Sequence, residues 1–375
     1  MNSEDKQAWP DLAGRALGGS VIYANDELFA ERENLIKPEE PVFRPHTFGH
    51  KGQIMDGWET RRRREPGSDA AIVRLGCGGV VRKVVVDTSY FTGNYPPEVS
   101  VEACGAEGYP SPAELAEATW TTLVPRSAVA GDARNEFEVE AGRRATHVRL
   151  TMFPDGGVAR LRVYGEPVPD PRLLPATIDL AALENGAVVT GCSNMFYSSP
   201  SNLLLPGQAR VMGDGWETSR RRDQANDWVE VRLACAGTVE VVELDTSHFV
   251  GNAPGWATLG SDSGDLLPRT ALQPDTRHRF AVPDGPVTGQ VRLDIYPDGG
   301  MARLRVTGRP TAQARAMLAE RFLRLLPEPQ LAGLLRAAGL PANEAARRAG
   351  ARAGLDALDG VPATTRELFH LHLST

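Results

Sequence analysis

An internal duplication constrains the fold of this chain more than any other feature. The segment Asp56-Gly57-Trp58-Glu59-Thr60 returns as Asp214-Gly215-Trp216-Glu217-Thr218, at an offset that equals 214 minus 56, or 158. Asp87-Thr88-Ser89 returns at the same offset as Asp245-Thr246-Ser247. The repeated positions are acidic, aromatic and hydroxyl-bearing, and not the interchangeable aliphatic residues that any core reuses. We therefore predict two homologous domains that present the same polar groups.

The apolar residues of both copies predict an all-β fold. Short apolar stretches alternate with polar residues and are separated by Gly, Pro, Asn and Asp, which is typical of strands with one face on a core. In the first copy the predicted strands are 71–75, 81–87, 98–103, 146–150 and 159–164. Helical spacing is limited to a short turn at 112–118. Each copy is therefore predicted to be an antiparallel sandwich of the jelly-roll type.

The two copies differ in length at two places. The turn signals Pro154-Asp155-Gly156 and Pro297-Asp298-Gly299 have a smaller offset, since 298 minus 155 is 143. The second copy is therefore shorter before this turn, by the difference between the offsets 158 and 143. Loops lose residues more easily than strands, and we assign the loss to the region of 111–122. Near the start, Val188-Val189 resembles Val21-Ile22, with one residue inserted before the shared Asn-Leu pair.

Composition shifts give the domain boundaries. We predict a weakly held N-terminal arm and a proline-rich linker between the copies, followed by an Ala-, Leu- and Arg-rich helical C-terminal extension. The predicted segments are the arm 1–14, the first jelly-roll repeat 15–170, the linker 171–177, the second repeat 178–309 and the extension 310–375. The extension is short for a core of its own, so we expect it to pack on the sandwiches or on a neighbouring subunit.

Charge and cysteine content exclude several classes of protein. The net charge is -7 and the sequence pI is about 5.6, so nothing draws the whole chain to nucleic acid or to an anionic membrane. No apolar run approaches the length of a membrane span and no secretion signal is evident, so we expect a cytoplasmic protein. The four cysteines form no Cys-x-x-Cys pair and are interpreted as small apolar strand residues.

The arginines that follow each Trp motif indicate anion binding. Guanidinium forks suit planar carboxylate or ureido oxygens, and the predicted anion-binding residues are Arg62, Arg63, Arg220 and Arg221. The neighbouring acids have three open roles: they accept from ligand N–H groups, orient the arginines or transfer protons. These acids are Asp56, Glu59, Asp214 and Glu217. The alternative is purely structural, with the indole filling the core and the charged groups forming surface ion pairs.

Other polar residues join the candidate site because they lie where strands leave the sandwich. They are Thr60, Asp87 and Asn94, with their copies Thr218, Asp245 and Asn252. The alternative for the two aspartates is that they hold a loop through bonds to its backbone. His248, which stands where the first copy has Tyr90, is an acid–base candidate. His46 and His50 lie four positions apart in a non-helical segment and have no counterparts, so the metal ligands, if any, stay unknown.

Taken together, these motifs resemble the allantoicase family. The resemblance covers about residues 18–308 and rests on Met55–Arg64, Val86–Pro97, Ser201–Leu204 and Gly213–Thr218. It implies two jelly-roll domains related to the discoidin or galactose-binding-like fold, and usually a homo-oligomer. It also implies hydrolysis of allantoate to ureidoglycolate and urea in purine breakdown.

The implied substrate fits the residues, because allantoate offers one carboxylate for an arginine fork and ureido groups for acid and amide partners. The implied catalytic candidates are Glu59, Asp56, Glu217 and Asp214, with His248. The need for a divalent metal such as Mn²⁺ stays open. The second copy keeps the family stretch Asn226-Asp227-Trp228, whereas the first reads Ser68-Asp69-Ala70, so the departure counts against the first copy's site or leaves it as a wall for the second copy's site.

Two alternatives to an enzyme are retained. A non-catalytic, discoidin-like tandem module that binds a carbohydrate or another ligand predicts exposed aromatic loop tips. A homologue that lost its activity and serves as a scaffold is suggested by the departure at Ser68-Asp69-Ala70. An enzyme predicts a concave site that gathers Asp, Glu, Arg and His side chains.

Overall fold

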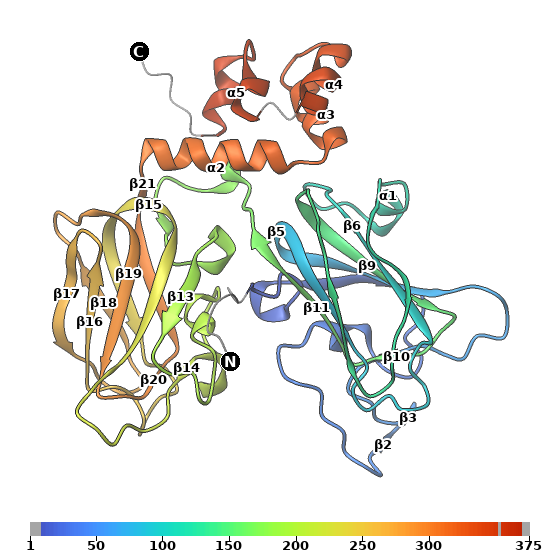
Figure 1. Ribbon diagram of the computed structural model, residues 1–375, viewed down its shortest axis with the longest axis horizontal. Helices are drawn as coiled ribbons and strands as arrows, with labels where there is room; N and C mark the ends of the chain where they lie inside the picture. Colours follow the sequence, from blue (N-terminus) through green and yellow to red (C-terminus); the bar gives the residue numbers. More distant parts are fainter. Residues whose placement is uncertain (1–8, 352–353, 370–375) are drawn as a thin grey trace. The chain divides into compact units, whose positions relative to one another are not determined.

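The computed structural model describes residues 9–351 and 354–369 and divides them into two compact units, each built on one repeat (Figure 1). The first comprises residues 9–168 with 323–351, and the second comprises 169–322 with 354–369. Both are antiparallel β-sandwiches, which confirms the prediction of two tandem jelly-roll repeats with a short helical C-terminal extension.

In the first repeat, one long strand belongs to both layers of the sandwich. The first half of β5 (Asp69–Asp87) pairs with β1 and β9, and that layer continues through β6 and β7. Its second half pairs with β8 and β11. The partners are β1 (Ser20–Ala24), β6 (Glu98–Cys104), β7 (Thr121–Ala128), β8 (Arg134–Glu138), β9 (Ala145–Phe153) and β11 (Arg160–Pro167).

The sequence predicted separate strands at 71–75 and 81–87, but β5 continues through the glycines between them. The pairing with β9 shifts register between Arg74 and Gly79, where the strand passes from one layer to the other. A Cβ at Gly76 would lie 2.4 Å from the carbonyl oxygen of Leu17, and one at Gly79 would lie 2.3 Å from that of Glu166. Glycine is needed here because the neighbouring backbone approaches too closely for a side chain.

The second repeat has the same arrangement around β15 (Asp227–Asp245). One layer contains β13 (Val188–Cys192), β19 (Val287–Tyr296), β16 (Trp256–Ser261) and β17 (Gly264–Ala271). The other contains β18 (Arg277–Ala281), β21 (Arg303–Pro310) and β12 (Ile178–Asp179).

The larger length difference lies between β6 and β7, as predicted. Ala103 pairs with Thr121 in the first repeat, and Ser261 pairs with Gly264 in the second. The first connection therefore spans 104–120 and the second only 262–263, which accounts for the whole difference between the two sequence offsets. The longer connection contains α1 (Pro112–Ala116), which is the predicted helical turn and is capped by Ser111 and Glu114.

The predicted one-residue insertion near the start of the second repeat is wrong. Ser20 pairs with Arg74 and Val188 pairs with Arg232, so Ser20 and Val188 are equivalent, at an offset of 188 minus 20, or 168. The same offset relates Asn34 to Asn202, each of which donates to the glycine carbonyl of its Trp motif. Since the offset of the motifs themselves is only 158, it is the first repeat that is longer before its motif. Its additional segment includes the hairpin of β2 (Phe48–Gly49) and β3 (Gly52–Gln53).

Each sandwich core contains the Trp of its motif. Trp58 and Trp216 are both fully buried, and their indole N–H groups donate to the backbone carbonyls of Asp26 and Asn194 at 2.8 Å. Burying an indole is favourable when its N–H finds an acceptor, which these carbonyls provide. The indole therefore fills the core, as the purely structural interpretation of the motif predicted.

The N-terminal arm is held from its tenth residue onward, since the Gly165 N–H donates to the Pro10 carbonyl at 3.1 Å. Residues 1–8 lie outside the described residues, but Asp11 forms a bridge with Tyr164, and Leu12 is fully buried with its N–H donating to Val163. The prediction of a weakly held arm as far as residue 14 is therefore wrong for residues 10–14. These residues are held because β11 offers unpaired backbone groups at its edge.

The C-terminal extension is helical, as predicted. Its α-helices are α2 (Ala312–Leu325), α3 (Glu328–Ala337), α4 (Ala342–Ala351) and α5 (Ala363–Glu367). Part of it packs on the first repeat: the Arg143 guanidinium donates to the carbonyls of Arg324 and Leu326 at 3.0 and 3.1 Å, and the Arg144 N–H donates to that of Leu325. This part of the extension is thus stabilised by its contacts with a sandwich.

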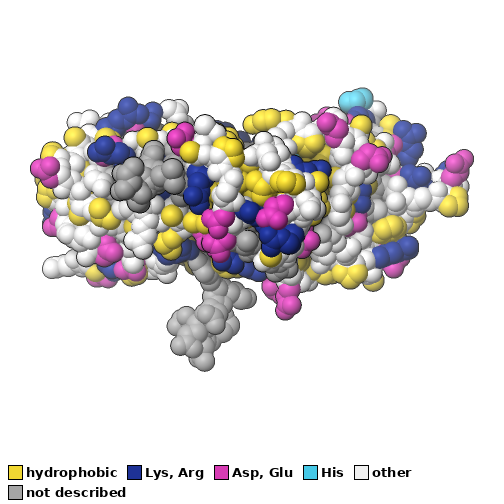
Figure 2. Space-filling view, turned by 90° about the horizontal axis from the view of Figure 1, so that it is seen from above, with side chains coloured by type: hydrophobic (Ala, Val, Ile, Leu, Met, Phe, Trp, Pro, Cys, Tyr) yellow, Lys and Arg dark blue, Asp and Glu magenta, His cyan; other side chains and the backbone are white. Residues whose placement is uncertain are grey.

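Charges of both signs are interspersed over the face shown in Figure 2, without a large area of one sign. No helix in the described part of the chain is long and apolar enough to cross a membrane. Within the described residues, the four cysteines form no disulfide with one another.

Candidate functional site

The two Trp motifs form equivalent short strands. In the first repeat β4 (Trp58–Glu59) pairs with β10 (Gly157–Val158), and in the second β14 (Trp216–Glu217) pairs with β20 (Gly300–Met301). Successive side chains of a strand point to opposite faces, so a buried Trp leaves the next residue, Glu, on the opposite face. Both glutamates are half-buried.

Each glutamate contacts the candidate asparagine of its own repeat. Asn94 Nδ2 donates to Glu59 Oε1 at 2.8 Å, and Asn252 Nδ2 donates to Glu217 Oε1 at 2.7 Å. Burial raises the pKa of Glu59 above its ordinary value, and the Asn94 bond offsets this in part. A half-buried carboxyl group with a raised pKa is suited to hold and deliver a proton. Residues that the sequence placed 35 positions apart therefore form one acid–amide pair in each copy.

Asp56 has a different environment. Burial favours a higher pKa, but bonds from Arg160 at 2.7 Å, from the Val42 N–H at 3.0 Å and from Lys37 at 3.2 Å together hold the pKa of Asp56 below its usual value. Asp214 likewise has a lowered pKa, because the bonds from Arg210 outweigh its burial. These carboxylates stay ionised and fasten loops, which makes them poor proton donors.

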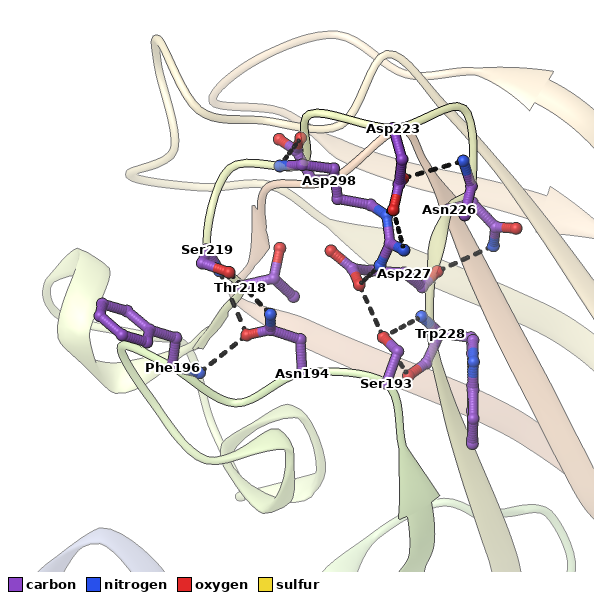
Figure 3. A network of polar contacts seen from close by, with 12 residues as sticks. Ser193, Asn194, Phe196, Thr218, Ser219, Asp223, Asn226, Asp227, Trp228 and Asp298 are labelled. Carbon is purple, nitrogen blue, oxygen red and sulfur yellow. Dashed lines mark hydrogen bonds and ion pairs between the residues drawn. The ribbon is translucent and has the colours of Figure 1, made fainter.

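Of the predicted anion-binding arginines, one in each repeat is paired within the protein. The backbone N–H groups of Arg63 and Arg221 donate at 2.8 Å to Asp155 and Asp298, the aspartates of the Pro-Asp-Gly turns. Nη1 of Arg63 donates to Asp69 at 2.6 Å, and Nη1 of Arg221 donates to Asp227 at 2.7 Å. In Figure 3, Asp227 and Asp223 come from the start of β15 and the loop before it, and Asp298 comes from the Pro-Asp-Gly turn. All three accept hydrogen bonds from Arg221.

The other two arginines, Arg62 and Arg220, point to solvent. Both are exposed, and neither forms an ion pair with another residue that the structure describes. They are available to a ligand but are not held in place, so a fork at these positions is not preorganised.

Thr60 and Thr218, predicted to bind substrate, are only 3% exposed, and their hydroxyls donate to the carbonyls of Gly156 and Gly299. Asp87 and Asp245 are 2% exposed and accept from the N–H groups of Ser89 and Ser247 at 2.8 and 2.9 Å. The structure thus gives all four residues contacts that shape the loops around the glutamates, which is the alternative that the sequence left open for the aspartates.

The candidate histidines do not converge on the glutamates. His248 is exposed, and its Nε2 lies 3.0 Å from the carbonyl oxygen of Ala209, so this nitrogen carries the proton in that bond. His46 and His50 are exposed residues flanking β2. Within residues 9–351 and 354–369, no three His, Cys, Asp or Glu side chains gather closely enough to hold a metal ion.

Sequence reasoning missed a buried carboxylate behind each arginine. Asp69 and Asp227 are 1% and 0% exposed, and one oxygen of each, Oδ2, is buried without a hydrogen-bond partner. Their other oxygen accepts from Asn25 in the first repeat and from Ser193 in the second, besides the arginine. The signal was present, since 227 minus 69 is 158 and the residue is Asp in both copies.

Two further surface features are a hollow and a group of exposed apolar side chains. A hollow of about 680 Å³ in the first unit lies between the 103–123 segment and Pro327–Gln330 and contains none of the predicted site residues. The second repeat has exposed apolar side chains at Met195, Phe196 and Tyr197, 64 to 72% accessible, on the loop after β13, where the Tyr197 N–H donates to the backbone carbonyl of Glu217. These are the aromatic loop tips that a binding module predicts.

The fold and the site define a class: a tandem jelly-roll protein with one ancestral polar site present twice. Comparison with known proteins identifies the family within this class. A family model described as the allantoicase repeat matches residues 10–168 and 178–311, which are the two repeats. The chain belongs to the allantoicase family.

Individual relatives agree. The chain is 61% identical over 310 residues to a probable allantoicase of Nocardia farcinica, covering 80% of this chain and 94% of that one. It is 50% identical over 337 residues to a probable allantoicase of Streptomyces coelicolor, covering 84% and 90%. The crystal structure of allantoicase from Saccharomyces cerevisiae matches with a TM-score of 0.71 at 36% identity, covering 81% of this chain and 94% of that one.

Proposed function

We propose that this protein hydrolyses allantoate to ureidoglycolate and urea in purine breakdown, as a hydrolase acting on a carbon–nitrogen bond of a linear amidine. Membership of the allantoicase family supports the substrate. The observation that carries the proposal is the acid–amide pair, Glu59 with Asn94 and Glu217 with Asn252, present in both repeats at 2.7 to 2.8 Å.

The reaction adds water across one aminal carbon–nitrogen bond. The water oxygen bonds to the carbon, the carbon–nitrogen bond breaks, and the departing nitrogen takes a proton and leaves as urea. A glutamic acid whose pKa is raised by burial holds a proton near neutral pH better than an exposed one, and Glu59 meets this condition. Its carboxylate then recovers a proton from the attacking water, so the site returns to its starting state.

Asn94 has a positioning role in this proposal. Its amide donates to Oε1 of Glu59, which leaves Oε2 to carry and transfer the proton. Asp56 stays an ionised loop fastener, and His248 lies outside the proton path because its Nε2 is engaged by a backbone carbonyl.

The test measures urea release from allantoate by the purified chain, beside Glu59→Gln and Glu217→Gln. Glutamine keeps the acceptor for the asparagine but transfers no proton, so a variant at a working site loses about 10²- to 10⁴-fold in kcat. Each reaction is run after chelation and again with added Mn²⁺, which decides the metal requirement. If the folded native chain releases no urea under either condition, the hydrolase proposal is refuted.

The binding-module alternative has one observation in its favour, the exposed Phe196 and Tyr197. It predicts no urea release and retention on immobilised carbohydrate that Phe196→Ser abolishes. The same exposed side chains also suit contact with another copy of the chain. The expected homo-oligomer stays a prediction, which light scattering during gel filtration measures.

A further inference from the structure

The two repeats differ at one guanidinium group. In the second repeat Arg221 is fully paired: Nη1 donates to Asp227 at 2.7 Å, while Nε and Nη2 donate to the two oxygens of Asp223 at 2.9 and 3.1 Å. Asp223 therefore binds the Nε–Nη2 edge through both of its oxygens, which is the geometry in which a carboxylate binds arginine best.

In the first repeat the same edge has no carboxylate. Arg63 keeps the bond from Nη1 to Asp69, but its Nε is buried without a hydrogen-bond partner, and Nη2 donates to no other residue in the described part of the chain. The position of Asp223 is taken by Glu65, since 223 minus 158 is 65, and Glu65 is exposed and forms no ion pair there. A buried charged donor without an acceptor is costly and calls for a ligand.

Gly67 lies beside this edge. A Cβ there would lie 2.5 Å from Nη2 of Arg63 and 3.0 Å from its Nε, so a side chain at this position would force the guanidinium group to shift. The matching residue of the second repeat is Ala225, whose N–H donates to Asp223 at 3.0 Å and helps to hold the carboxylate there. The Arg63 side chain as a whole is 28% exposed, whereas its Nε is buried.

We propose that the Nε–Nη2 edge of Arg63 binds the carboxylate of the substrate, and that only the first repeat carries a working site. In the second repeat Asp223 occupies the equivalent place as a built-in carboxylate. This inference rests on the proposed function, in which allantoate supplies the carboxylate.

The position of Arg63 supports this assignment. Its backbone N–H is held by Asp155, and Glu59 pairs with Gly157, so one short turn, Asp155–Gly157, holds both the anion-binding residue and the proton donor. Arg221 and Glu217 lie along the matching turn, but there the edge that would bind a carboxylate is filled. The loss of the Asn-Asp-Trp stretch from the first copy, which counted against its site, left Asp69 in place.

The first experiment compares the KM for allantoate of Arg63→Lys, Glu65→Asp and Asp223→Ala. Lysine keeps a charge beside Asp69 but loses the fork, so KM rises by about 10- to 100-fold with kcat changed less. Glu65→Asp moves the clamp of the second repeat into the first and raises KM by competing with the substrate. Asp223→Ala empties the matching edge of Arg221 and leaves Arg63 untouched, so KM does not rise. An unchanged KM in Arg63→Lys, with a raised KM in Arg221→Lys, would overturn the assignment.

The second experiment needs no turnover and separates this inference from the proposed function. Titration calorimetry with N-carbamoylglycine, which has one carboxylate and one ureido group, is expected to give one site per native chain and none in Arg63→Lys. Two equal sites, or one site that survives Arg63→Lys, would refute the assignment even in an active enzyme. Thermal melting checks that each variant is folded. A native chain that binds one equivalent yet releases no urea refutes the hydrolase proposal alone.

Discussion

Arg160→Met tests whether a buried guanidinium fastens the long loop beside Glu59. The Arg160 side chain is 1% exposed and donates to four oxygens: the carbonyls of Glu39, Asp56 and Ala159 at 2.8 to 2.9 Å, and the Asp56 carboxylate at 2.7 Å. Methionine fills a similar volume without donors, so the change removes the bonds while most of the packing stays.

The expected loss of unfolding free energy is about 3 to 5 kcal/mol, since the change breaks one buried charged pair and leaves buried acceptors to find water. For a unit of this size, that corresponds to a fall of about 6 to 20 °C in its melting temperature. Urea denaturation followed by tryptophan fluorescence measures it, because Trp58 lies two positions from Asp56.

The matched control is Arg303→Met in the second repeat. Arg303 donates to the carbonyls of Gly207, Asp214 and Ala302, whereas the Asp214 carboxylate is bonded by Arg210. Burial lowers the pKa of Arg303 to about 10, so its charge is held at a cost that the substitution removes. We expect a smaller loss, about 1 to 3 kcal/mol. Equal losses in the two variants would refute the claim that the carboxylate pairing decides the difference.

Two further predictions concern the same surroundings. Burial raises the folded pKa of Glu59 above its unfolded value, so folding favours the protonated form of this group. Its contribution to the free energy of unfolding is complete below the unfolded pKa and is lost as pH rises through the folded pKa. Glu59→Gln, which mimics the protonated form, should therefore melt higher than the native chain at neutral pH and match it below about pH 4; a lower melting temperature at neutral pH contradicts this. In Gly300→Ala, the new Cβ would lie 1.9 Å from Phe249 Cε1, so we expect loss of folded protein on gel filtration. Gly251→Ala, where nothing lies within 4 Å, is the control and should fold normally; folding of both variants would show that the aromatic contact is not tight.

Much of the fold was predictable, because it depends on local pattern. Alternating apolar residues predicted the strands, Pro-Asp-Gly predicted the turns, and the constant offset of 158 predicted the duplication. The same pattern failed at Gly76–Gly79, which was expected to end a strand. There β5 continues, and glycine is needed because the backbones of Leu17 and Glu166 approach too closely for a side chain.

The candidate site divides in the same way. The sequence alone determined which chemical groups occur twice, and so predicted the acid–amide–arginine set and its family. Only the tertiary structure decided what each group does, because a carboxylate's role depends on partners that are distant in the chain. Asp56 is paired by Arg160, 104 positions away, whereas the carboxyl group of Glu59, close behind Asp56 in the same motif, accepts a hydrogen bond from the neutral amide of Asn94. One carboxyl group is therefore held ionised and the other is left able to keep a proton.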